Sequence, residues 1–140
     1  MRGRAIRHIT FILLAIFIAG AAKGVSDTLQ FHYGTSVFAT FKNEQWWNPD
    51  ISWKNKYRDY DSGDTREAYL FSRSLLVWRT DAWHLAQTIE TLGWALAALA
   101  AIKLGYWHRP SGASGAGLFA LMLAAFYCGF MLLWAWLLAG

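Results

Sequence analysis

The sequence is poor in cysteine, proline and charge. Its single Cys, at position 128, excludes an internal disulfide and a zinc site built from cysteines. It has only 2 Pro, and charged residues make up 16% of the chain, against about 25% in a typical soluble domain. The basic residues do not gather in one patch, so nucleic acid is not expected as a partner.

Familiar sequence motifs of soluble enzymes are also missing. The chain has no G-x-S-x-G nucleophile motif, no H-E-x-x-H zinc motif, no phosphate-binding loop and no C-x-x-C pair. The common soluble chemistries are therefore disfavoured. The sequence does not identify a cofactor, and it leaves cofactor content, metal content and enzymatic activity open.

What the chain does have is long apolar runs, in a composition that is 56% hydrophobic. Residues 118–138 are 21 residues without a charge, and about 20 helical residues cross the hydrocarbon core of a bilayer. Residues 85–104 form a second run of similar length, which contains Glu90 and ends at Lys103. Both runs predict membrane-spanning helices.

The N-terminal apolar run, residues 9–22, permits two interpretations. It follows three arginines and ends in small residues, as the core of a cleaved signal peptide does. Alternatively, it is the first part of a retained helix, because Lys23, Asp27 and Gln30 share one helical face beyond it. We favour the retained helix. The predicted fold is then an all-α integral membrane bundle, a single domain of residues 1–140 with spans at about 6–30, 82–104 and 116–138.

The segment between the first two spans, residues 34–80, is polar and rich in aromatic residues. Trp and Tyr favour the membrane interface, where the ring and its polar group each find a suitable medium. Residues Ala68, Phe71, Leu75 and Trp78 recur at helical spacing, which predicts an amphipathic helix leading into the second span. We expect the whole segment to form an outward-facing cap over the bundle, anchored by Trp46, Trp47 and Trp53.

The density of positive charge indicates an orientation. Lys and Arg favour the cytoplasmic side of a membrane. They are densest in the first seven residues and around the 105–114 turn. A short Gly/Ser/Ala-rich turn at residues 111–117 connects the last two spans. We therefore expect a multi-pass protein of the bacterial inner membrane, with its N-terminus in the cytoplasm and residues 34–80 outside.

Polar residues line one face of the second predicted span. On a helical wheel they occupy an arc of about 120°, opposite the leucines. Unsatisfied polar groups in hydrocarbon cost several kcal/mol each, so this face must meet other helices or water. The residues of the arc are Thr80, Asp81, His84, Gln87, Thr88 and Thr91.

The first span offers a matching face. If both helices end at the same surface, Lys23 and Asp27 lie level with Asp81 and His84, and Gln30 lies one turn beyond. The candidate catalytic residues are Asp27, Asp81 and His84, which as acid, base or metal ligands would form a site at the outward mouth. The same groups also suit a structural ion-pair network. The other polar candidates are Lys23, Gln30, Gln87, Thr88 and Glu90, of which Glu90 lies off the main arc, inside the apolar stretch.

Small residues recur at four-residue spacing on all three predicted spans. Gly20 with Gly24, Gly93 with Ala97, and Ala125 with Gly129 are examples, and such pairs let helix backbones approach closely. The size, the aromatic segment and these faces favour an accessory, assembly or lipid-binding membrane subunit. Its partners would be membrane lipids and other membrane subunits, or a second copy of the chain. The alternative is a small membrane enzyme that acts on a lipid-borne substrate through the Asp/His site, with or without a metal.

Overall fold

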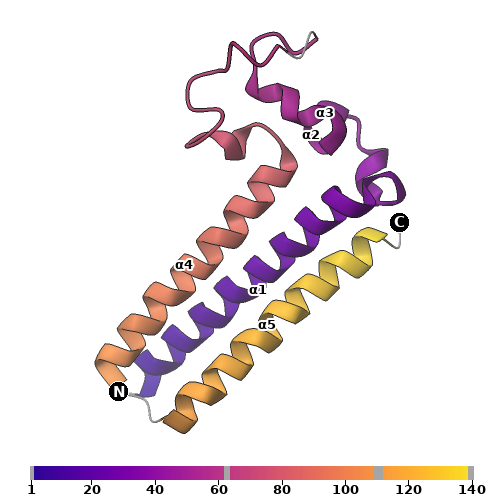
Figure 1. The fold of residues 1–140 in the computed structure, drawn as a ribbon. Coiled ribbons are helices and arrows are strands. Elements are labelled where there is room, and N and C mark those ends of the chain that lie inside the picture. The colour runs from indigo at the N-terminus through magenta and orange to yellow at the C-terminus, as the bar shows by residue number, and fades with distance from the viewer. Residues whose placement is uncertain (1, 62–63, 109–111, 139–140) are drawn as a thin grey trace.

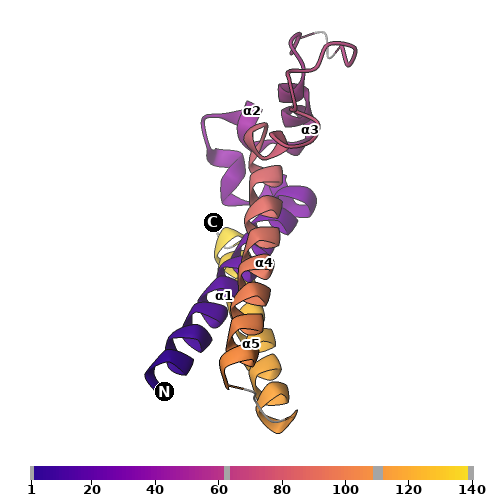
Figure 2. The same cartoon turned by 90° about the vertical axis from the view of Figure 1, so that its left-hand side faces the viewer.

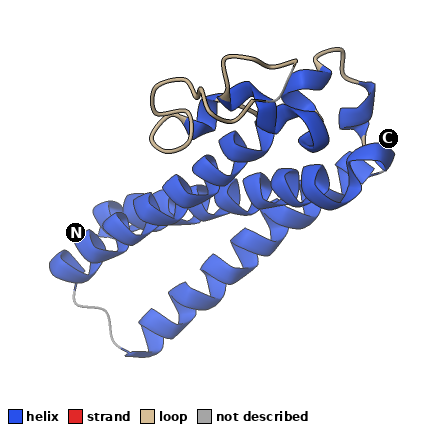
Figure 3. Ribbon diagram, turned by 45° about the horizontal axis from the view of Figure 1, so that its top comes forward, coloured by secondary structure: helices blue, strands red, loops and turns tan. Residues whose placement is uncertain are grey.

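The fold, in a computed structural model that describes residues 2–61, 64–108 and 112–138, is dominated by three long helices (Figure 1). These are α1 (Arg2–His32), α4 (Ala82–His108) and α5 (Gly112–Leu138). The described chain has three helical stretches long and apolar enough to cross a membrane, which are Gly3–Thr35 (α1 continued through Thr35), Ala82–Gly105 in α4 and Gly112–Leu138 in α5. The predicted all-helical architecture with three candidate spans is confirmed, and the described residues contain no strand (Figure 3).

Helix α1 is the middle helix of the three. It packs along both α4 and α5, antiparallel to α4 and parallel to α5 (Figures 1 and 2). Its buried residues therefore face two neighbours, whereas seven large apolar side chains of α5 are exposed. An apolar exposed face of this kind suits contact with lipid.

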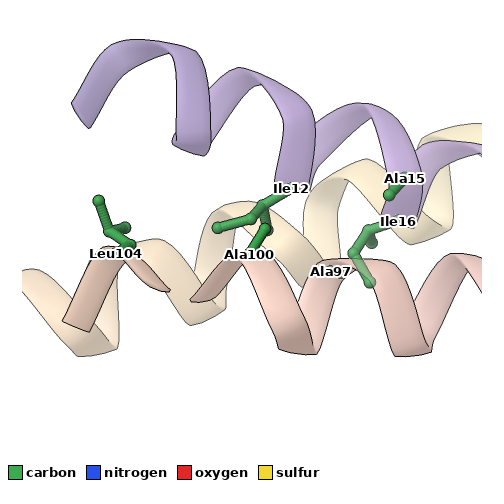
Figure 4. Packing of buried hydrophobic residues seen from close by; sticks show 6 residues of the cluster. All are labelled: Ile12, Ala15, Ile16, Ala97, Ala100 and Leu104. Atoms are coloured by element: carbon green, nitrogen blue, oxygen red, sulfur yellow. The ribbon is translucent and has the colours of Figure 1, made fainter. Parts of the chain in front are cut away.

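The contact between α1 and α4 is built from aliphatic residues and small ones. Ile12, Ala15 and Ile16 of α1 meet Ala97, Ala100 and Leu104 of α4, and all six are buried (Figure 4). Small side chains on α4 let the isoleucines of α1 come close to the α4 backbone. Lipid tails are as apolar as these side chains, so in a bilayer close packing holds such helices together.

Glycines set the distance between the helices. A Cβ at Gly20 would overlap the carbonyl group of Phe126 on α5, and one at Gly129 would overlap that of Phe17 on α1. A Cβ at Gly93 of α4 would lie 2.7 Å from the carbonyl oxygen of Ala15. The predicted close approach is therefore confirmed at these positions.

Other small residues do not take part in such contacts. A Cβ at Gly105 would meet nothing within 4 Å. The predicted turn at 111–117 is wrong from Gly112 onward, because α5 begins there. The small residues at its start form helix and lie exposed; residues 109–111 lie outside the described residues.

Residues 33–61 and 64–81 form the cap, which lies at one end of the three helices (Figures 1 and 3). It consists of short helical turns joined by loops. Asn48 caps one turn by accepting a hydrogen bond from the N–H of Asp50 at 3.0 Å. In chain order the elements are η1 (Tyr33–Thr35), η2 (Val37–Thr40), α2 (Glu44–Trp47), α3 (Pro49–Ser52), η3 (Trp53–Lys56) and η4 (Val77–Arg79).

Aromatic side chains attach the cap to the ends of the long helices. Phe38 stacks on Trp47 with ring centroids 5.0 Å apart. The buried Phe38 belongs to a cluster with Leu29 of α1, Ala82 of α4 and Leu137 of α5. Trp46 and Trp47 pack against this cluster, whereas Trp53 is 39% exposed. The cap therefore contacts all three long helices at once.

The predicted amphipathic helix over residues 68–78 is wrong. The segment forms consecutive turns followed by η4, and Phe71 has a positive φ of 59° that an α-helix does not allow. The Ser72 hydroxyl donates to the carbonyl of Lys56 at 2.7 Å and ties the segment to η3. As a result Leu75, expected to pack inward, is 74% exposed.

Candidate functional site

Asp81 and His84 lie together where the cap meets α4. Asp81 directly precedes α4 and its side chain is buried. It accepts the backbone N–H of His84 at 2.9 Å, as a helix N-cap residue does. The same carboxylate contacts Nδ1 of the His84 ring at 2.7 and 2.8 Å. Helix capping therefore also positions the imidazole.

Hydrogen bonds keep Asp81 ionised although it is buried. Burial alone would raise its pKa. The bonds from the His84 ring, the His84 N–H and the Thr80 hydroxyl, the last at 2.8 Å, outweigh burial. The pKa of Asp81 therefore lies below its ordinary value, and the group is a carboxylate at neutral pH.

Lys56 of the cap completes the environment of His84. Its Nζ lies 3.3 Å from His84 Nε2. An ammonium group only donates hydrogen bonds, so all contacts are favourable when the ring is neutral, with Nδ1 donating to Asp81 and Nε2 accepting from Lys56. The single lone pair of Nε2, which a general base or a metal ligand would use, is therefore engaged by Lys56, and such a role requires the Lys56 side chain to move aside.

Asn55 holds this part of the cap in place. Its side-chain amide donates to the carbonyl of Gln45 on α2 and to that of Thr80, both at 2.7 Å. These bonds join α2, η3 and the residue before Asp81. Neither Asn55 nor Lys56 stands out in the sequence, because the loop pattern around them does not reveal partners 25 and 28 residues away.

A hollow of about 250 Å³ opens beside the Asp81–His84 pair. Trp53 and Trp83 form aromatic walls, and Gln30 and Ser52 contribute polar groups. Trp83 also donates from Nε1 to Gln30 Oε1 at 3.3 Å. The volume lies below the roughly 300 Å³ at which pockets for drug-sized ligands begin, so this hollow fits a small molecule or one group of a larger one.

Asp27 and Lys23 lie elsewhere, in a second group of charges. The two form an ion pair with each other, one turn apart on α1. They are also the charged groups that act electrostatically on Glu90 of α4. The chain therefore has a charged group of Lys23, Asp27 and Glu90 within two candidate spans, whereas the sequence suggested that Glu90 stood apart.

The register of α1 against α4 explains this division. Gln30 meets Trp83, and Asp27 lies three residues before Gln30, toward the middle of the bundle. Asp81 lies two residues before Trp83, in the opposite direction along the bundle axis. The two carboxylates are thus displaced by about five residues, or about 7.5 Å, along the axis. Our assumption of equal depth is wrong for Asp27 and Asp81.

The same register brings Lys23 level with Glu90, because each lies seven residues from the Gln30–Trp83 contact. Within the described parts of the chain, no three His, Cys, Asp or Glu side chains are grouped so as to hold a metal ion. Asp27, Asp81 and His84 therefore do not form the common metal site that the sequence allowed.

The remaining candidates lie on α4 next to His84. The hydroxyl of Thr88 donates to the carbonyl of His84 at 2.8 Å, and that of Thr91 to the carbonyl of Gln87 at 2.9 Å. Gln87 is exposed. Val77, His84, Gln87, Thr88, Thr91 and Leu92 line a hollow of about 260 Å³.

The chain matches no family model, no curated protein and no solved structure in comparisons with known proteins. Its function is therefore inferred from its own residues and their arrangement.

Proposed function

We propose that the chain is a multi-pass membrane subunit that assembles with another membrane helix through one face of α4. The observation that carries this proposal is Gln87. Its side chain is exposed within the candidate span Ala82–Gly105, and its amide has no hydrogen-bond partner among the residues that the structure describes. Lipid tails cannot satisfy an amide, but a polar group on a neighbouring helix can.

The surroundings of Gln87 support the same proposal. Thr88 and Thr91 extend the polar face along α4, and the hollow beside them leaves room for a side chain of a partner. By contrast, Leu121 and Leu132 of α5 are 53% and 61% exposed and apolar. One side of the bundle therefore suits lipid and the other suits a protein partner.

Charge supports an orientation for this subunit. Arg2, Arg4 and Arg7 lie within the first seven residues, and Lys103 and Arg109 lie beside the short connection after the second span, whereas the seven Lys and Arg of residues 34–82 are spread over 49 positions. By the positive-inside rule, the N-terminus and the connection between α4 and α5 lie in the cytoplasm, and the cap lies outside. In a bacterium this corresponds to a multi-pass protein of the inner membrane.

A site-specific photo-crosslinker at Gln87 tests the assembly in native membranes. We expect a cross-linked product whose mass equals two copies of the chain or one copy plus another membrane subunit. A cross-linker at Leu132 provides the lipid-facing control and should yield lipid adducts. Lipid adducts alone at Gln87 would overturn the proposal.

Two Thr→Val variants, one on this face and one away from it, test whether the polar groups of the face contribute to assembly. Thr91→Val should reduce the cross-linked or co-purified partner severalfold, since an interhelical hydrogen bond contributes about 0.6–2 kcal/mol. Thr10→Val makes the same change at an exposed threonine of α1, away from the polar face. It should leave assembly unchanged, and equal losses in both variants would contradict the proposal.

A second candidate function is catalysis on a lipid-borne substrate, and the Asp81–His84 pair favours it. A carboxylate that orients an imidazole, with the second ring nitrogen beside a hollow, is an arrangement that acid–base catalysis uses. Purified protein incubated with membrane lipid extract should then change a lipid, and His84→Gln should abolish this in a folded protein. Equal turnover by both proteins would exclude this role for His84.

A further inference from the structure

A long apolar groove runs between α1 and α4 on the part of the bundle farthest from the cap. Its larger section, about 720 Å³, reaches Lys103. A smaller section of about 200 Å³ continues toward Ile89, and the two sections share Phe11 and Leu96. From Lys103 to Ile89 the groove follows α4 for about 21 Å, which exceeds the roughly 15 Å of one leaflet's hydrocarbon. Figure 2 shows the first turns of α1 diverging from α4 at this end.

The end of the groove carries positive charge. Arg7 and Lys103 line it from opposite helices, with His8 beside them. Both cations are exposed. No Asp or Glu occurs in residues 1–26 or 91–140, so neither of the two helix segments that form this end supplies an acid to neutralise them.

We propose that this groove binds an anionic phospholipid. The lipid phosphate contacts Arg7 and Lys103, and one acyl chain lies along the groove past Phe11 and Leu96. The match is one of both charge and shape: basic groups between membrane helices bind anionic headgroups, and the walls beyond them are aliphatic or aromatic. The basic end of the groove lies at the opposite end of α4 from the Asp81–His84 pair, and the proposal does not rest on the function proposed above.

Charge argues against a second copy of the chain as occupant. A copy inserted in the same orientation would bring its own Arg7 and Lys103 to the same depth, and like charges at close range repel. A partner helix that uses the groove would also need to fit walls with few hydrogen-bonding groups. A phospholipid meets both requirements, because its headgroup is negatively charged and the acyl chain that lies in the groove needs no hydrogen bonds.

The test uses the full chain in detergent, titrated with phosphatidylglycerol or with phosphatidylcholine of the same acyl chains and followed by native mass spectrometry. We expect phosphatidylglycerol to bind and phosphatidylcholine to bind at least tenfold more weakly. Arg7→Gln with Lys103→Gln should weaken phosphatidylglycerol binding about 25-fold, from about fivefold for each cation near a membrane surface. Equal binding of the two lipids, or no effect of the double variant, would overturn the proposal.

Two further variants distinguish the contribution of the lipid headgroup to binding from that of the acyl chain. Leu96→Trp places a large ring where the two sections meet and should reduce phosphatidylglycerol binding while the cations remain. Arg58→Gln with Lys42→Gln removes two exposed cations of the cap and should leave binding unchanged. Inorganic phosphate at millimolar concentration should not compete with phosphatidylglycerol, because it has no acyl chain to fill the groove. Competition by phosphate, together with no effect of Leu96→Trp, would show a simple anion site and refute the groove.

Discussion

The two halves of the bundle are held together in different ways. The cap half, comprising the cap, α1 from Ala21 and α4 up to Leu92, contains every acidic residue of the chain. There, ion pairs and hydrogen bonds join side chains, as at Asp81 with His84 and at Lys23 with Asp27. The far half, α1 up to Gly20 and α4 from Gly93, has no acid and depends on glycine, alanine and isoleucine in close contact.

The difference shows what each half can do. Close-packed apolar helices hold their distance and offer little chemistry, because they contain few groups that titrate or donate hydrogen bonds. The cap half tolerates buried polar groups only because each has a partner, and no buried side-chain polar atom lacks one in the part of the chain described. Hydrogen-bonded and ionic side-chain contacts are therefore concentrated in the cap half, whereas the far half combines close apolar packing with the cations at its end.

The largest effect should come from adding one methyl group where the two halves meet. In Gly20→Ala the new Cβ overlaps the backbone carbonyl of Phe126, which cannot move aside as a side chain would. We expect a loss of about 3 kcal/mol of unfolding free energy, the upper part of the range for overpacked sites. Tryptophan fluorescence during denaturation in detergent measures it.

Gly117→Ala is the matched control for this prediction. It also lies in a long helix, on α5, but a Cβ there would meet nothing within 4 Å. Because alanine favours helix over glycine by up to about 1 kcal/mol, this variant should be as stable as the native chain or slightly more so. If both substitutions had the same effect, close packing would not be what holds α1 against α5.

A smaller loss is expected in the cap half from Asp81→Ala. The change removes a helix N-cap, which contributes about 1 kcal/mol, and leaves the His84 ring and the Thr80 hydroxyl without their shared acceptor. We expect about 2 kcal/mol of destabilisation in total. Asp64→Ala, which removes a carboxylate paired with Arg66 at the surface of the cap, should change stability too little to measure. Similar losses for both variants would contradict the role assigned to the buried carboxylate.

The smallest effect should appear as a dependence on pH. Because the pKa of Asp81 is lower in the folded chain than in the unfolded one, its charge stabilises the fold fully above about pH 4. The stabilisation is lost as the pH falls through the folded-state value. The stability difference between the native chain and Asp81→Asn should therefore shrink below about pH 4. A difference that stays constant down to pH 2 would show that the carboxylate charge does not contribute.

Sequence patterns predict which helices form in this fold better than they predict how far one helix is shifted along its neighbour. Apolar runs located the three long helices, and small residues at four-residue spacing identified Gly20, Gly93 and Gly129 as contact points. Helical phase correctly placed Asp81 and His84 together, since both lie on one helix. Phase does not determine how far one helix is shifted along another. That shift depends on contacts such as Gln30 with Trp83, and so Asp27 pairs with Lys23 rather than with Asp81.

The cap shows a second limit of sequence patterns. Helical spacing over residues 68–78 suggested a helix, yet Phe71 turns the backbone and Ser72 bonds to Lys56, 16 residues earlier. Long-range hydrogen bonds of this kind depend on the fold of the whole segment. They override a local pattern, because an isolated short helix is marginal in stability.

The pairing of Lys23 with Asp27 on one helix has a consequence for how the chain is made. If α1 enters the bilayer as it leaves the ribosome, it must wait for α4, whose first residue is 59 positions after Lys23. At about 5–20 residues per second, that wait lasts on the order of seconds. A lone Lys or Asp near the middle of an inserting helix costs about 3 kcal/mol, whereas two opposite charges one turn apart neutralise each other within the same segment. The first helix thus carries its own counter-ion during biosynthesis, before any other part of the protein exists to supply one.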